Sequence, residues 1–267
     1  MKYLVVRRAS VRGATAVASS AFITPPGPLP ALGWSHAVAR ALGVSVTGVA
    51  MIHHGSEFRA ESERPGAYSR GPAFHQFRAA SFIDQKDYSS TNRHALSLQP
   101  TARCDLELSL IVEMDEDAHP DLEHATELVE TGRFAGGRFD GKAHVALHEE
   151  LDAAVRTTGG GFALHDRTDL LRGNSGHDPL DRLLAWLDPN RDRRVEPWLL
   201  PATLGYRTIT PIASRAGARE GLPHAFVESL VGLVQYRNAW SETPSFWRYD
   251  RPSHDTFLAT TLPENDA

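Results

Sequence analysis

Carboxylates are absent from the beginning of this chain of 267 residues. No Asp or Glu occurs in residues 1–56, which hold five basic side chains and so carry a net charge of +5. Because the whole chain carries −5, the remainder carries −10. This division of charge excludes a uniformly basic coat protein. It predicts a protein that binds an anionic partner through one defined surface. The alternative is a short basic strand with no partner at all.

Cysteines and long apolar runs are also scarce. Cys104 is the only cysteine, which excludes an intramolecular disulfide. No apolar run approaches the roughly 18–20 residues that span a bilayer, and the apolar stretch after Lys2 is too short for a signal sequence. We therefore expect a cytoplasmic protein without membrane contact.

Complete motifs for nucleotide hydrolysis and hydrolase catalysis are absent. The segment from Gly136-Gly137 to Ala143 has phosphate-loop spacing, but Ala143 stands where Ser or Thr must hold magnesium. A glycine turn that lets backbones approach closely is the better interpretation. No Gly-x-Ser-x-Gly elbow occurs. Cys104 lies in a strand-like segment and is expected to be packed, which makes it a poor nucleophile.

The thirteen histidines do not form a metal-binding framework. His144 and His148 could share a helix face, but no third ligand follows at motif spacing. His53 and His54 would point to opposite faces of a strand and cannot hold one metal together. We expect no metal and no cofactor, while an acid–base site built from scattered His, Tyr and Lys residues stays open.

Hydrophobic periodicity predicts an α+β fold. Tyr3–Val6 is typical of a first strand that leads into basic residues, and Arg103–Met114 alternates clearly between apolar and polar. Gly43 and Gly132 are placed to end two helices. The predicted elements up to residue 150 are a strand at 3–6, a helix from 29 to 42, strands at 44–52 and 103–114, a helix from 120 to 132 and a strand near 143–147. This is the βαββαβ order of ferredoxin-like or RRM-like domains.

A long insertion interrupts this order at residues 55–101. It lacks periodicity, and basic residues, among them Arg78, Lys86 and Arg93, recur between aromatic ones. Such spacing suits a flexible element that contacts single-stranded nucleic acid. It equally suits a solvated loop whose aromatics pack back onto the domain.

Residues 151–267 predict an irregular α/β extension packed on the first domain. We expect helices at 151–155 and from Pro179, with Asp178 as N-cap, and a strand at 204–212. Residues 226–236 fit a strand or a helix, the segment from Ala18 to Pro28 should be irregular, and the tail from Arg251 should fray. The acidic run 113–130, with eight carboxylates and no Lys or Arg, is either a solvated face or a surface kept away from nucleic acid.

Several blocks, in their order, resemble one known family. They are Ala16–Ser20 leading to Ala31–Ala37, Arg103–Glu113, Arg133–Gly137, Pro201–Pro211 and Phe226–Ser229. The family is the Cas-five-type subunit of type I-F CRISPR surveillance complexes (Cascade), the second Csy subunit. After Glu228-Ser229 the chain reads Leu-Val-Gly where Gly-Glu-Trp is usual, which fits a divergent or variant type I-F system.

This resemblance implies a non-catalytic RNA-binding subunit in antiviral defence, with a ferredoxin-like domain whose long thumb would be the insertion at residues 55–101. It would hold the 5′ handle of the CRISPR RNA, join the large subunit to the backbone subunit of the filament, and meet target DNA indirectly. Trp34 and His36 would be packing residues of the first helix. The RNA-binding residues that we expect are Arg7, Arg8, Arg12, Ser19, Ser20, Arg78, Lys86, Arg93, Arg103, Arg133, Gly136 and Gly137.

Two other functions remain open at this stage. Cas-five-type relatives in another CRISPR subtype cut repeat RNA without metal, so a metal-independent endonuclease is the first alternative. The second is an acidic protein-interaction subunit that does not touch RNA.

Overall fold

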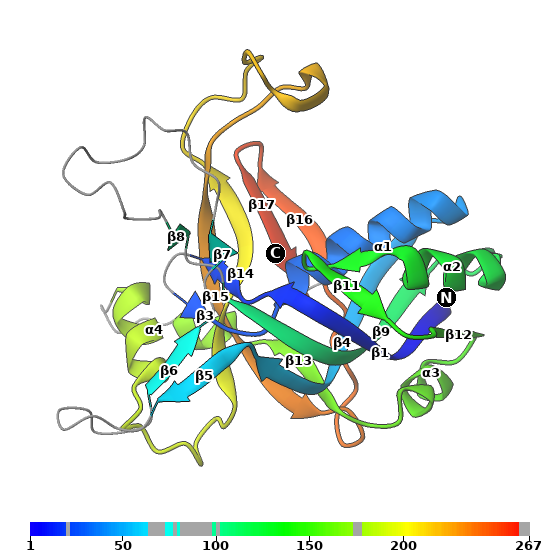
Figure 1. Cartoon of the computed structure of the whole chain (residues 1–267), viewed down its shortest axis with the longest axis horizontal. Helices are drawn as coiled ribbons and strands as arrows, with labels where there is room; N and C mark the ends of the chain where they lie inside the picture. Colours follow the sequence, from blue (N-terminus) through cyan, green and yellow to red (C-terminus); the bar gives the residue numbers. More distant parts are fainter. Residues whose placement is uncertain are drawn as a thin grey trace.

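The computed structural model describes residues 1–19, 22–63, 73–76, 79–80, 98–99, 102–172 and 178–261, with backbone alone at 18–19, 61–63, 73–76, 79–80, 98–99 and 219. The described chain is a mixed α+β structure dominated by one large, curled, antiparallel sheet (Figure 1). Of the predicted RNA-binding residues, Ser20, Arg78, Lys86 and Arg93 lie outside the described residues.

Eleven strands of the described chain form the main sheet. In chain order they are β1 (Lys2–Thr15), β4 (Val46–Phe58), β9 (Arg103–Met114), β10 (Arg133–Phe134), β11 (Gly137–Asp140), β12 (His144–His148), β13 (Phe162–Asp166), β14 (Leu199–Thr208), β15 (Val227–Asn238), β16 (Arg248–Ser253) and β17 (Thr256–Thr260). Their order across the sheet is β10-β11-β1-β9-β4-β13-β15-β14-β17-β16, and β12 pairs with the beginning of β1. The first half of the chain therefore contributes the strand order β12-β1-β9-β4.

Four α-helices accompany the sheet in the described chain: α1 (Pro28–Leu42), α2 (Leu122–Thr131), α3 (Leu151–Thr158) and α4 (Pro179–Leu187). Three short strand pairs lie outside the sheet: β2 (Val17–Ser19) with β3 (Phe22–Ile23), β5 (Ala60–Glu63) with β6 (Ala73–Gln76), and β7 (Ala79–Ala80) with β8 (Leu98–Gln99). Two 3₁₀ turns, η2 (Thr168–Leu171) and η3 (Arg219–Gly221), complete the elements. None of the helices described is long and apolar enough to cross a membrane.

The two faces of the sheet are covered differently. Successive strand side chains point to opposite faces, so Leu4 and Val6 enter the larger core beneath α1 and α2, while Val5 enters a smaller core beneath α3. Helix α3 is only about two turns long and covers this second face near Val5 alone. Farther along β1, the same face is uncovered and carries exposed polar residues. That uncovered part is called the open face below.

Helix α1 follows its sequence signals. Pro28 stands at its first turn, and Gly43 ends it in the left-handed conformation (φ 67°). Trp34 is buried against the edge of Phe139, and His36 stacks on Tyr249 at 4.6 Å between ring centroids. The prediction that Trp34 and His36 are packing residues is confirmed.

Most local predictions in the first half are also confirmed. The strand Arg103–Met114 has the predicted bounds, and Gly132 ends α2 as predicted. This helix begins at Leu122, two residues later than predicted, with the Asp121 side chain as its N-cap. Further along, Asp178 caps α4, as its sequence indicates. His144 and His148 lie on strand β12 rather than on a helix.

The extension beyond residue 150 is more regular than predicted. It supplies five strands that continue the sheet from β4, since β13 pairs with β4. The ambiguous segment 226–236 belongs to strand β15, and the tail from Arg251 does not fray up to Thr260 because β16 and β17 pair there. The prediction of a fraying tail was wrong, because β17 pairs with β16 and also with β14, far earlier in the chain. The segment 18–28 is irregular from Thr24 to Gly27, as its prolines predict, although Ser19 and Phe22 pair in the short β2–β3 hairpin.

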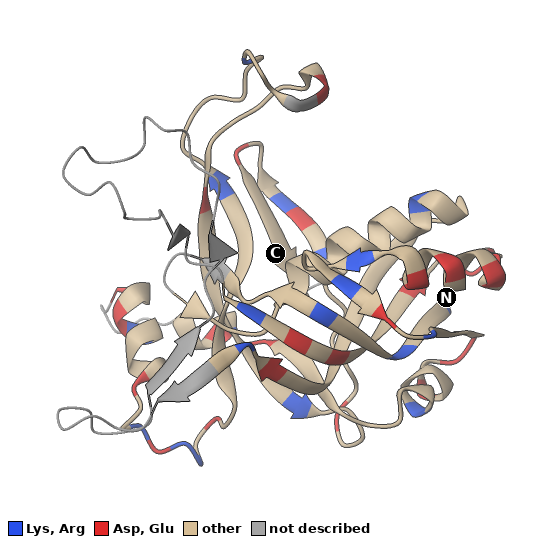
Figure 2. Cartoon of the chain, viewed as in Figure 1, with Lys and Arg blue, Asp and Glu red and all other residues tan. Residues whose placement is uncertain are grey.

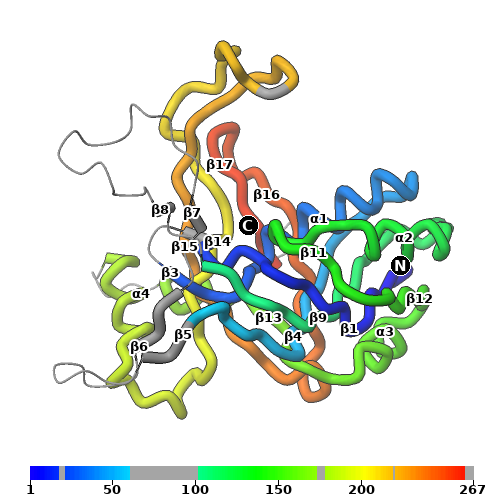
Figure 3. Tube along the Cα trace, in the orientation of Figure 1, coloured from blue at the N-terminus to red at the C-terminus, as the bar shows by residue number. Residues whose placement is uncertain are grey.

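The connection between β14 and β15 projects from the sheet as a long arm, residues 209–226 (Figure 3). Several large apolar side chains of this arm are more than half exposed, namely Ile209, Ile212, Leu222 and Phe226. An exposed apolar cluster of this kind is typical of a surface that meets another protein.

A tight hairpin joins β10 to β11 and rests against β1. Its two turn residues, Ala135 and Gly136, both have positive φ (49° and 76°), as two-residue hairpin turns require. The next residue, Gly137, touches the neighbouring strand, and a Cβ placed there would lie 2.7 Å from the Ala14 nitrogen and 2.8 Å from the Arg12 oxygen. Gly137 is therefore needed for the close approach of β11 to β1.

We expect Gly137→Ala to lower the free energy of unfolding by about 2 kcal/mol or more, because backbone atoms of β1 would have to move. Gly55→Ala is the matched control, since a Cβ there meets no heavy atom within 4 Å, and it should change stability by less than about 1 kcal/mol. Urea denaturation of both variants measures the difference. Equal stability of the two variants would refute this role of Gly137.

Candidate nucleic-acid interface

Two β-bulges in β1 bring its arginines to the open face. The register with β9 shifts between Val6 and Ala9, so Arg7 and Arg8 are both exposed although they are adjacent in sequence. Arg8 has a positive φ of 43°, and its amide donates to Ser109 Oγ at 2.9 Å. A second shift, before Ala14, follows the exposed Arg12.

Carboxylates from later strands pair with part of this basic segment (Figure 2). Arg8 lies 3.2 Å from Glu107 on β9, and Arg12 pairs with Asp140 on β11. The acid-free start of the chain is thus partly neutralised by residues more than ninety positions away. The sequence asymmetry alone overstates the positive charge of this surface.

Asp105 holds the end of this surface together. Its carboxylate accepts hydrogen bonds from the Gly13 amide (2.7 Å) and from Arg59 (2.8 Å). Desolvation by burial raises the pKa of Asp105, but these two hydrogen bonds and the nearby arginines outweigh it and lower the pKa below its ordinary value. Arg103, an expected RNA-binding residue, donates to the Gly13 carbonyl at 2.7 Å and remains exposed.

Three arginines lie side by side across neighbouring strands. Arg133 on β10 is opposite Arg138 on β11, and Arg138 is opposite Arg12 on β1. All three are exposed, and directly opposed like charges destabilise a sheet unless an anion lies between them. Among the described residues, Arg133, Arg138 and Arg7 have no hydrogen-bond or ion-pair partner. We call Arg7, Arg12, Arg133 and Arg138 the arginine cluster.

The sequence predictions for this surface are met unevenly. The structure brings Arg7, Arg8, Arg12, Arg103 and Arg133 to one region of the sheet, with Gly136 and Gly137 forming the hairpin that presents Arg138. Ser19 ends strand β2, and its side chain is not described. Sequence reasoning missed Arg138, although its place directly after the glycine pair was a signal.

A cavity of about 660 Å³ lies at the end of β4. Its lining includes His53 and His54 of β4, Phe162 of β13, and Trp186 and Trp198. His54 Nε2 lies 2.7 Å from Ser109 Oγ, the same oxygen that accepts from the Arg8 amide. The two rings therefore point to opposite faces of the sheet, as the sequence predicts: His54 contacts Ser109 on the open face, whereas His53 packs on Tyr236, which lies against the larger core.

Burial lowers the pKa of both histidines to about 4, assisted at His53 by His54 and at His54 by Arg8 and Arg7. Both rings are therefore neutral at physiological pH. Among the residues that the structure describes, neither ring nitrogen of His53 has a hydrogen-bond partner. Burial also raises the pKa of Cys104 to about 12, which confirms that this thiol is packed and unreactive.

No cluster of three or more His, Cys, Asp or Glu side chains able to hold a metal occurs in the part of the chain that the structure describes. A comparison with curated proteins finds no match. A family model described as "CRISPR-associated protein (Cas_Csy2)" matches residues 4–258, which is nearly the whole chain.

The neutral histidines predict a specific pH dependence of stability. The pKa of His53 is lower in the folded chain than in the unfolded one, so its contribution is complete above about pH 6.5 and is lost as pH falls toward 4. We expect the loss between pH 7 and pH 4 to be smaller by about 3 kcal/mol in His53→Leu, which cannot titrate. Urea denaturation across this range tests it, and parallel pH profiles for variant and wild type would contradict it.

Proposed function

The chain belongs to the Csy2 family of CRISPR-associated proteins, subunits of type I-F surveillance complexes, and we propose that it holds the 5′ handle of the CRISPR RNA on its open face. The arginine cluster carries this proposal. Four exposed arginines on neighbouring strands, three of them without a carboxylate partner in the described chain, offer spaced cations for consecutive phosphates.

The strand order supports a ferredoxin-like domain over residues 1–150. The order β12-β1-β9-β4, with α1 and α2 together on one face, is the arrangement that a βαββαβ chain adopts in this fold. We propose that residues 55–101 are its thumb and that residues 151–267 are an extension packed on it rather than an independent domain.

Within this proposal the residues have different tasks. Arg7, Arg133 and Arg138 would bind phosphates directly, whereas Arg8 and Arg12 would share their charge with Glu107 and Asp140. Arg103 would act at the edge of the face. The remaining proposed contacts are Ser19, Ser20, Arg78, Lys86 and Arg93, and Gly136 and Gly137 would shape the hairpin beside the RNA.

The arm 209–226 supports a role between other subunits. The arm projects away from the sheet (Figure 3), and four of its large apolar side chains are more than half exposed. We propose that such surfaces meet the large subunit and the backbone subunit, so that this chain bridges them without catalysis and meets target DNA indirectly.

Reversing one free charge tests the RNA-binding face. Arg138→Glu should weaken binding of the handle RNA and reduce the slope of log affinity against log salt by about 0.7, the value for one phosphate contact on a single strand. Arg40→Glu is the control, because Arg40 is also an exposed arginine and belongs to the acid-free segment, but lies on α1. Arg8 and Arg12 are less suitable, since reversal beside Glu107 or Asp140 would also create repulsion. Identical salt series for both variants would sink the proposal.

A nuclease assay separates this function from the alternative, a metal-independent repeat-RNA endonuclease. We expect the complex, incubated with repeat RNA and a chelator, to leave the RNA intact. Site-specific cleavage that persists in chelator would identify the endonuclease instead.

A further inference from the structure

Charges on the open face are arranged in rows that run across the strands. The first row, called the arginine row below, consists of the arginines that are opposite one another on β10, β11 and β1, namely Arg133, Arg138 and Arg12. Ser10 lies two residues from Arg12 along β1, so its side chain points to the same face. Ser10 is opposite Asp140 of β11 on one side and opposite Glu107 of β9 on the other. We call Asp140, Ser10 and Glu107 the acidic row.

Basic residues lie on both sides of the acidic row. The arginine row lies on one side, and Arg7 and Arg8, in the first bulge of β1, lie on the other. One arginine from each side pairs with the acidic row: Arg12 with Asp140, and Arg8 with Glu107 at 3.2 Å. Basic and acidic positions therefore interleave on these strands (Figure 2). The positive charge of β1 is interrupted rather than continuous.

These two ion pairs contribute little to the stability of the fold. The side chains of Arg8 and Glu107 are each 44% exposed, and those of Arg12 and Asp140 are 65% and 48% exposed. Water screens ion pairs at this exposure, so they add little to the free energy of unfolding. The position of these carboxylates is therefore not explained by stability.

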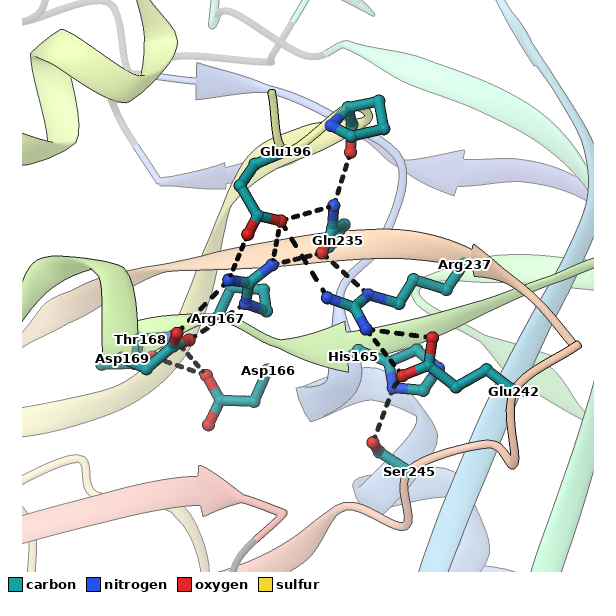
Figure 4. Close-up of polar contacts among 11 residues, drawn as sticks. His165, Asp166, Arg167, Thr168, Asp169, Glu196, Gln235, Arg237, Glu242 and Ser245 are labelled. Atoms are coloured by element: carbon teal, nitrogen blue, oxygen red, sulfur yellow. Dashed lines mark hydrogen bonds and ion pairs between the residues drawn. The ribbon is translucent and has the colours of Figure 1, made fainter. Parts of the chain in front are cut away.

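A less exposed ion network in the second half of the chain shows the contrast (Figure 4). The side chain of Arg167 is only 11% exposed, and it pairs with Glu196 and Asp169 and donates to Gln235. That network joins β13, β15 and the segment before β14, and its cation is already surrounded by acceptors. The carboxylates of the acidic row face solvent instead, where they act on any charged molecule that approaches the sheet.

The acidic row is a poor place for a phosphate. Neighbouring strands are about 4.8 Å apart, so a phosphate above Ser10 would have a carboxylate one strand away on each side. Both carboxylates would lie within the screening length of about 8 Å at physiological salt. Like charges at such distances repel incorrect ligands and fix the register of correct ones.

We propose that Glu107 and Asp140 are specificity-determining residues of the RNA-binding face. They keep the RNA backbone on the arginine row, across the strands, and prevent it from running straight along β1 from Arg7 to Arg12. This inference rests on the proposed function, because it concerns the same face. An RNA that contacts both Arg7 and the arginine row must bend around the acidic row, and an RNA without that shape is repelled.

Neutralising each carboxylate in the full chain tests the proposal, with the handle RNA and an oligouridine of equal length as ligands. Glu107→Gln and Asp140→Asn should each raise the affinity for oligouridine about threefold, because an arginine is released and a repulsion is removed. The slope of log affinity against log salt should steepen by about 0.7, the value for one added phosphate contact. The affinity for the handle should rise less, so the preference for the handle should fall.

Glu123→Gln is the matched control. It removes the same charge from an exposed position, but Glu123 lies on α2, which covers the opposite face of the sheet. It should leave both affinities and the salt slope unchanged, and an equal gain in this variant would overturn the proposal. Urea denaturation of all three variants shows whether the fold is kept. A purely structural role predicts the opposite result, namely lower stability with unchanged or weaker RNA binding.

The two proposals fail in different ways. If Arg138→Glu changes the salt dependence but the neutral variants do not strengthen oligouridine binding, the RNA-binding face stands and the selective role of Glu107 and Asp140 is wrong. If neither Arg138→Glu nor the neutral variants change the binding of either RNA, both proposals are wrong.

Discussion

The antiparallel pairing of β1 with β9 is the constraint on which the rest of the structure depends. It brings the acid-free start of the chain against a strand that carries Asp105, Glu107 and Ser109 on the same face. Its two bulges interrupt the alternation of side chains between the two faces of the sheet. The first of them exposes the adjacent residues Arg7 and Arg8 together. The remaining edge of β1 accepts β11 and β12, and through β11 the arginines of the hairpin.

Electrostatics on the open face follow from this pairing. Carboxylates from β9 and β11 neutralise Arg8 and Arg12, which keeps a dense row of cations compatible with a stable sheet. The arginines left without carboxylates are then the ones free for an external anion. A surface with both kinds offers its unpaired cations at one place, whereas a uniformly basic sheet would attract any polyanion.

The extension beyond residue 150 continues the same sheet and supplies one wall of the cavity at the end of β4. Strands β13 and β15, with the network around Arg167 and Gln235, fix the segment that carries Trp198 at the end of β4. The cavity is therefore made from both halves of the chain.

The sequence by itself determined the local elements of the first half, because the alternation in Arg103–Met114 and the glycines after α1 and α2 act over a few residues. Blocks of residues in a fixed order determined the family. The sequence also located the basic segment. Tertiary structure alone decided which arginines are free, that the tail from Arg251 forms strands, and that a cavity exists beside His53. The physical reason is range: ion pairs, strand register and bulges depend on partners far along the chain, whose positions no local pattern contains.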